Sequence, residues 1–183
     1  MLGCANERHT GPGGEDTALG FTCPGASDGA ERSGLSFDIV GPVSDEFFVR
    51  VKVRGYEVDT QGHLNWAQYL HYAEHARWEY LAAAGITQER LLASGIGPAV
   101  MDVQVSFRRE LHGGDEIDVG CTFEFGAGKT FQVRQEFRRA DGLLAADLTS
   151  MSGLIDLAER KLVANPAERL RAIAADPSVL GIL

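Results

Sequence analysis

The chain has no excess of basic side chains. Of its 183 residues, 17 are Lys or Arg and 26 are Asp or Glu, which gives a formal net charge of −9 and a pI near 5.0. Basic pairs at Arg108–Arg109, Arg138–Arg139 and Arg160–Lys161 lie too far apart to form one stripe. This composition argues against a nucleic-acid-binding surface. We expect these pairs to be solvated on strands and loops, with phosphate binding by some of them as the alternative.

Cysteine is scarce, and long apolar runs are missing. Cys4, Cys23 and Cys121 are odd in number and lack metal-ligand spacing, which favours a reduced intracellular protein over a disulfide framework. No apolar run reaches the roughly 18 residues of a membrane-spanning helix, and residues 1–4 lack the apolar segment of a signal peptide. We therefore expect a cytoplasmic protein with no membrane partner.

Aromatic residues are nearly absent from residues 1–45, where only Phe21 and Phe37 occur. Small, polar and acidic residues dominate this segment and cannot bury enough apolar surface to offset the cost of ordering. We predict a flexible N-terminal extension over 1–45 and one folded domain over 46–183, long enough for a complete hydrophobic core. The extension shows no helical periodicity that would indicate a helix-turn-helix.

The folded part begins with a strand pattern followed by a long helix pattern. Apolar and basic side chains alternate over residues 47–54, which predicts a half-buried strand. Over 64–84 the period is helical, and apolar residues cover most of the circumference, so this helix must be covered on several sides. Gly85 fits the residue that ends it, and residues 87–94 predict a short second helix.

The remaining sequence predicts strands over 100–109, 116–125, 131–139 and 143–156, separated by glycine-rich turns. Four successive strands with tight turns predict an antiparallel meander, and a last short helix is expected over 167–175. The fold class is therefore α+β, with a curved antiparallel sheet wrapped around one long helix. Its exposed edges favour pairing between subunits.

Two motifs resemble ligand sites only superficially. Residues 126–130 match the end of a phosphate-binding loop, but a strand follows them where that motif needs a helix, so we predict a hairpin turn. His71 and His75 lie one helical turn apart without a third ligand, so we expect a solvated face and no bound metal. Glu74 and Arg77 are expected to form an ion pair, with catalysis by Glu74 as the less favoured alternative.

The strongest candidate site lies between the first strand and the long helix. Asp59 and His63 precede the helix, whose first turn carries unpaired N–H groups and a partial charge of about +0.5 e. Asp59 could cap the helix, but His63 or Asn65 lies nearer to its start. A carboxylate just outside a helix N-terminus, beside a histidine, suits a general base or nucleophile acting on a polarised carbonyl.

The segment 59–70, continued by 72–81, resembles the hotdog-fold thioesterases of the 4-hydroxybenzoyl-CoA and acyl-acyl-carrier-protein thioesterase group. The shared pattern is an Asp, a Gly near the turn, a Tyr-Leu pair and a downstream Glu-x-Ala-Arg-x-Glu. Weaker similarities extend the match to about residues 47–170. The resemblance implies a hotdog fold, in which a curved antiparallel sheet wraps around one long helix.

The resemblance also implies the reaction, which is hydrolysis of an acyl-CoA or acyl-carrier-protein thioester. It implies no cofactor other than the coenzyme A or phosphopantetheine that the substrate carries. Members of this group are homodimers or homotetramers with sites at the subunit interface, so a homo-oligomer is expected. Two alternatives stay open, namely a hotdog dehydratase or hydratase and a non-catalytic acyl-CoA sensor.

Residue by residue, Asp59 falls on the catalytic aspartate of these thioesterases and would act as nucleophile or general base. Gln61 and His63 fall where the carrier-protein branch has Asn and His, and would position water or the leaving thiolate. Trp66 falls on the residue whose backbone N–H polarises the thioester carbonyl. Two further residues belong to the expected oxyanion and substrate-binding set, Asn65 beside Trp66 and Tyr69 one turn further along the helix.

Overall fold

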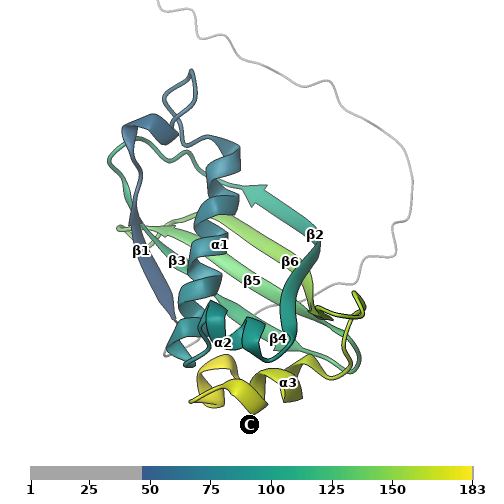
Figure 1. Ribbon diagram of the computed structural model, residues 1–183. Coiled ribbons are helices and arrows are strands. Elements are labelled where there is room, and N and C mark those ends of the chain that lie inside the picture. The colour runs from purple at the N-terminus through teal and green to yellow at the C-terminus, as the bar shows by residue number, and fades with distance from the viewer. Residues whose placement is uncertain (1–46, 183) are drawn as a thin grey trace, which may run out of the picture. The chain divides into compact units, whose positions relative to one another are not determined.

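The computed structural model describes residues 47–182, so the predicted extension over 1–45 lies outside the described residues. The described chain forms a six-stranded antiparallel sheet with helices against it (Figure 1). The elements in chain order are β1 (Phe48–Lys52), the 3-10 helix η1 (Gly55–Glu57), α1 (Trp66–Ala83), α2 (Gln88–Ala93), β2 (Ile96–Phe107), β3 (Glu116–Gly120), β4 (Thr122–Phe125), β5 (Thr130–Arg139), β6 (Leu144–Asp156), α3 (Pro166–Ile173) and the 3-10 helix η2 (Pro177–Leu180). The predicted α+β class and antiparallel sheet are confirmed.

The strand order is β1-β3-β5-β6-β2, and β4 pairs with β5. The predicted meander is therefore wrong at its first strand, because β2 pairs with β6 at one edge of the sheet and not with β3. β2 and β6 are the longest described strands, with 12 and 13 residues, and they pair over nearly their whole length. In the sheet, β6 and β5 lie between β2 and β3. Residues 108–115, which connect β2 to β3, therefore have to cross past these two strands.

Two strand boundaries also differ from those predicted. β2 begins at Ile96 and includes Pro98, which is tolerated because an edge strand lacks ladder bonds on one side. The strand predicted over 116–125 is divided at Cys121 into β3 and β4, and both parts pair with β5.

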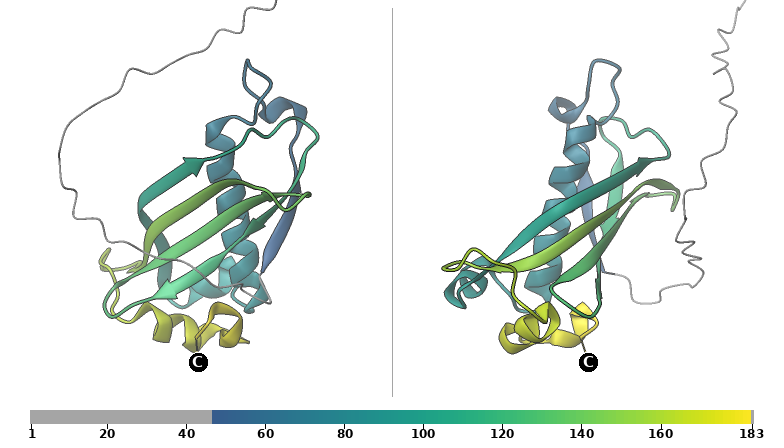
Figure 2. Two further views of the ribbon diagram at one scale, coloured as in Figure 1. Left: turned by 180° about the vertical axis from the view of Figure 1, so that it is seen from behind. Right: turned by 90° about the vertical axis from the view of Figure 1, so that its right-hand side faces the viewer.

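Helix α1 has 18 residues and lies against one face of the sheet (Figures 1 and 2). Asn65 is its N-cap, since the Asn65 Oδ1 accepts the Ala67 N–H at 3.0 Å. Gly85 follows the C-cap with φ of 77°, a left-handed conformation that glycine adopts without strain, as predicted. Within residues 47–182, no helix is long and apolar enough to cross a membrane.

The core consists of two clusters of buried apolar residues along α1. One lies beside the first half of α1 and includes the fully buried Leu111, Ile117 and Phe137. The other lies toward the C-terminal end, where α2, α3 and η2 gather (Figure 1), and includes the fully buried Ile86 and Leu180. The N-terminal end of α1 is left uncovered by these short helices.

A buried carboxylate, Glu57, anchors the chain just before the 59–65 loop. Its oxygens accept the Tyr72 O–H at 2.5 Å, the Arg54 backbone N–H at 2.7 Å and the Arg54 Nη1 at 3.0 Å. The Glu57 carbonyl also accepts the Asn65 N–H at 2.9 Å. Burial raises the pKa of Glu57, but these hydrogen bonds outweigh it and hold the pKa below its usual value. Glu57 thus ties the loop to α1.

Glu57 should make stability depend on acid pH. A carboxyl whose pKa is lower in the folded than in the unfolded chain stabilises the fold above its unfolded pKa, about 4.3 for Glu. This stabilisation is lost as the pH falls through the folded pKa. We expect Glu57→Gln to have a lower melting temperature than wild type at pH 7. The difference in melting temperature should become smaller below about pH 4, where the wild-type carboxylate loses its stabilising effect. Thermal unfolding at several pH values measures this difference, and Glu159→Gln, at an exposed position, serves as the control. A difference between Glu57→Gln and wild type that stays constant with pH would contradict the prediction.

Candidate active site

A cavity of about 350 Å³ opens at the N-terminal end of α1. Four of the predicted site residues line it together, namely Asp59, His63, Trp66 and Tyr69. The other lining residues are Leu64, Phe107, Arg108, Arg109, Glu110 and Leu111. Among the described residues, Gln61 and Asn65 are not part of this wall, because Gln61 lies exposed in the turn and Asn65 serves as the helix N-cap.

Asp59 organises the loop that precedes α1. Its Oδ1 accepts the Gln61 N–H at 2.8 Å and the His63 N–H at 3.1 Å. Its own N–H donates to the His63 carbonyl at 2.7 Å. Within residues 47–182, the Asp59 Oδ2 accepts no hydrogen bond. The carboxylate is therefore fixed through one oxygen and keeps the other for a ligand, while Asn65 provides the helix cap.

The first helical N–H groups supply a second functional feature. No acceptor for the Trp66 N–H is found among the described residues, whereas the Ala67 and Gln68 N–H groups bond to Asn65. The first turn of α1 contains no acidic side chain, so no carboxylate within the helix itself offsets the partial positive charge of its N-terminal end. This end of α1 can receive a carbonyl oxygen that becomes negative.

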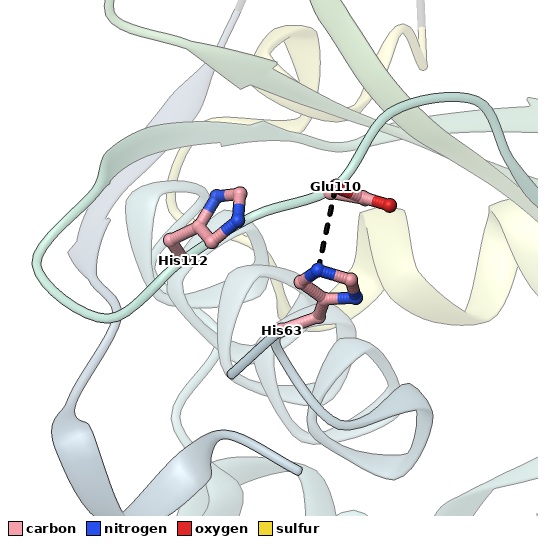
Figure 3. A group of neighbouring side chains, drawn as sticks. All are labelled: His63, Glu110 and His112. Carbon is pink, nitrogen blue, oxygen red and sulfur yellow. Dashed lines mark ion pairs between the residues drawn. The ribbon is translucent and has the colours of Figure 1, made fainter. Parts of the chain in front are cut away.

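The crossover between β2 and β3 completes the cavity. The Leu64 N–H donates to the Leu111 carbonyl at 2.6 Å, and His63 pairs with His112 in an isolated antiparallel bridge. The Glu110 Oε2 lies 3.3 Å from the His63 Nε2 (Figure 3). Glu110 and His112 carry no recognisable spacing relative to residue 63. They become neighbours of the site only because β2 lies at the far edge of the sheet.

Two aromatic residues, Tyr69 and Phe107, form part of the cavity wall. The Tyr69 ring meets the Phe107 ring at 5.0 Å and the Phe137 ring at 5.3 Å, both edge to face. Burial raises the pKa of Tyr69 to about 12, so its phenol stays neutral at physiological pH. Trp66 differs, since this residue is 68% exposed. Tyr69 therefore offers an apolar surface to a ligand, and Trp66 can contribute its backbone without being part of the core.

The basic pair Arg108–Arg109 lies at the rim of this cavity. Arg108 forms an ion pair with Asp147, and the Arg109 Nη1 donates to the Leu144 carbonyl at 2.9 Å. Both residues are exposed, as predicted. Their positive charge thus stands at the entrance rather than in the interior of the cavity.

The other motifs have the simple structural roles that were predicted. Glu74 pairs with Arg77 and also accepts the Trp78 Nε1–H at 2.7 Å. His71 and His75 are exposed on the surface of α1. Residues 126–129 form the turn between β4 and β5 and not a phosphate-binding loop.

A family model of the thioesterase-like superfamily matches residues 53–173. The chain belongs to this family. The matched region spans η1, the Asp59 loop, all of α1 and the whole sheet after β1. The family membership implied by residues 59–81 is therefore confirmed, and the described sheet with its helix is the fold of this thioesterase family.

Individual relatives agree with this assignment. The chain is 35% identical over 85 residues to the chloroplastic acyl-acyl carrier protein thioesterase ATL3 of Arabidopsis thaliana, covering 45% of each chain. It is 29% identical over 120 residues to the long-chain acyl-CoA thioesterase FadM of Escherichia coli, covering 65% of this chain and 90% of FadM. The crystal structure of YbaW, a probable thioesterase from Escherichia coli, superposes with a TM-score of 0.62 at 27% identity, covering 69% of this chain and 97% of YbaW.

Proposed function

We propose that this protein hydrolyses an acyl thioester in the cavity at the N-terminal end of α1. One observation carries the proposal, which is that Asp59 and Trp66 line the same cavity, while within residues 47–182 one Asp59 carboxylate oxygen and the Trp66 N–H have no hydrogen-bond partner. The relatives support it, because ATL3 is an acyl-acyl carrier protein thioesterase and FadM an acyl-CoA thioesterase. The common chemistry of these two substrates is a thioester.

The thioester carbonyl oxygen would accept the Trp66 N–H at the positive end of α1. Negative charge develops on this oxygen when the carbonyl carbon is attacked. A fixed N–H donor that stabilises this charge increases the rate by on the order of 10²- to 10³-fold. The partial positive charge at the N-terminal end of α1 adds to this effect, since no acidic residue lies in its first turn. The donor is the backbone of residue 66 and does not depend on the indole.

Asp59 would attack the carbonyl carbon or remove a proton from the attacking water. The N–H groups of Gln61 and His63 hold its Oδ1, so the free Oδ2 is presented in one orientation. A positioned general base contributes roughly 10²- to 10⁴-fold in rate. His63 lines the same cavity and would hold water or the leaving thiolate. Gln61 stays a candidate for this role from its exposed turn.

The substrate would bring its own carrier group, so no separate cofactor is needed. Coenzyme A and phosphopantetheine both end in the thiol that is released. The exposed Arg108 and Arg109 at the rim suit the phosphates of such a carrier. Tyr69, Phe107 and Leu111 provide an apolar wall for the acyl group. A cytoplasmic location stays a prediction from the sequence.

Thiol release from a panel of acyl-CoA and acyl-carrier-protein esters tests the reaction class. The panel should contain short, long and aromatic acyl groups, and both free thiol and free acid should be quantified. Hydrolysis predicts equimolar thiol and acid from at least one ester. A hydratase would alter the acyl chain without releasing thiol, and a sensor would bind an ester without changing it. Either of these results would contradict the proposal.

We expect the protein to form a homodimer or homotetramer through the free edge of β2. Val100, Met101 and Val103 on this strand are 43%, 46% and 41% exposed, and β2 is an edge strand of the sheet that residues 47–182 form. An apolar edge strand pairs readily with another chain. Light scattering should give at least about twice the chain mass of 19.7 kDa. Val103→Asp should lower the measured mass toward that of the monomer, whereas the control Leu92→Asp on α2 should leave it unchanged. A monomeric wild type would contradict assembly through β2.

A further inference from the structure

Three potential metal ligands meet at the rim of the cavity. His63, Glu110 and His112 each offer one ligand atom, and these atoms all lie within 4.8 Å of one another (Figure 3). His63 comes from the loop before α1, and the other two come from the crossover between β2 and β3. Two imidazoles and one carboxylate are a ligand set that zinc accepts in proteins.

The backbone explains why the three side chains converge. His63 and His112 are direct partners in an antiparallel bridge, which brings their side chains together across the two segments. Glu110 and His112 are two residues apart, a spacing that places side chains on the same side of an extended segment. The Leu64 N–H to Leu111 carbonyl bond of 2.6 Å holds the two segments in this register.

The distances are close to those of a metal site. Zinc bonds of roughly 2.0–2.2 Å in tetrahedral geometry place neighbouring ligand atoms about 3.3–3.5 Å apart. The His63 Nε2 and the Glu110 Oε2 already lie 3.3 Å apart. The His112 ligand atom lies within 4.8 Å of these two atoms, and His112 is exposed, so its side chain has room to turn toward a shared ion. Three protein ligands leave a fourth position open.

An ion pair alone is a weak reason for this cluster. The Glu110 side chain is 65% exposed, and an exposed ion pair contributes about 0–1 kcal/mol. The pairing of Glu110 with His63 also does not involve the His112 nitrogens. A shared cation gives all three side chains one function.

We propose that His63, Glu110 and His112 form a binding site for a divalent transition-metal ion such as Zn²⁺. Imidazole ligands favour such ions over Mg²⁺, which prefers oxygen ligands. A bound ion would occupy the His63 Nε2 beside the Asp59 loop. If the proposed hydrolysis is correct, Zn²⁺ therefore inhibits it, but metal binding itself does not depend on that function.

Titration of the full chain with Zn²⁺, followed by calorimetry, tests the site directly. Titration with Co²⁺, followed by visible absorption, provides a second probe. Loss of even an outer partner of a metal site costs roughly 10- to 100-fold in affinity, so removing a ligand should cost at least about that. We expect His112→Ala and Glu110→Gln each to weaken one saturable site at least about 10-fold. Both residues are exposed, and thermal unfolding checks that the variants remain folded.

His75→Ala is the matched control. His75 is also exposed and lies 3.9 Å from a carboxylate of Glu79, but it belongs to no three-ligand group among the described residues. This variant should bind Zn²⁺ as wild type does, and Mg²⁺ should bind to none of the proteins. The proposal is overturned if wild type shows no saturable Zn²⁺ binding, or if His112→Ala binds as tightly as His75→Ala.

Discussion

Replacing Asp59 by Asn should lower kcat for thioester hydrolysis by about 10²- to 10⁴-fold. The amide oxygen of Asn can still accept the Gln61 and His63 N–H groups, so the loop should keep its shape. The amide is neither basic nor a competent nucleophile, and only the chemical step should suffer. Thiol release at saturating substrate measures kcat, and thermal unfolding shows that the variant is folded.

Asp141 offers a matched control for this substitution. Its Oδ1 accepts the N–H of Leu143 at 3.1 Å, the same contact to the second following residue that Asp59 makes to Gln61. Asp141 lies in the exposed turn between β5 and β6 and does not line the cavity. Asp141→Asn should therefore keep kcat within about two-fold, since surface changes have small effects. Equal kcat in Asp59→Asn and wild type would remove Asp59 from the mechanism.

Replacing Trp66 by Pro should lower kcat by about 10²- to 10³-fold through loss of one backbone N–H. Residue 66 is the first residue of α1, where proline is well tolerated because this N–H has no helical partner. Asn65 has φ of −58° and ψ of 135°, which suits the residue before a proline. The variant thus removes the proposed oxyanion donor and leaves the helix in place.

Trp66→Ala separates the backbone from the side chain. It keeps the N–H and removes the side chain of a residue that is 68% exposed, so kcat should fall much less than in Trp66→Pro. Circular dichroism should show the same helix content in both variants. If the two variants lose the same activity, the indole carries the effect, and the proposed role of the N–H is wrong.

The local part of the site could be predicted from the sequence. The period of residues 64–84 defines α1, Gly85 ends it, and a carboxylate before its first turn indicates Asp59. These features depend on neighbours within a few residues, so short-range rules suffice. Trp66 and Tyr69 join the cavity because they lie near the start of the same helix.

The non-local part could not be predicted in this way. Tight turns favour pairing between successive strands, and this preference led to a meander in which β2 would neighbour β3. The observed pairing of β2 with β6 depends on a match between strands about 50 residues apart in sequence, which no turn residue encodes. The same pairing sends residues 108–115 across the sheet and brings Glu110 and His112 to His63. Their closeness to His63 could be recognised only from the fold.

Binding and turnover measured on the same variants test the central claim most directly. A non-hydrolysable thioether analogue of the best ester should bind to wild type, Asp59→Asn and Trp66→Pro with similar affinity. Wild type should release equimolar thiol and acid, and both variants should be slowed at least about 100-fold. Unchanged turnover in either variant, or a loss of affinity that accounts for the loss of rate, would contradict catalysis by Asp59 and the helix end.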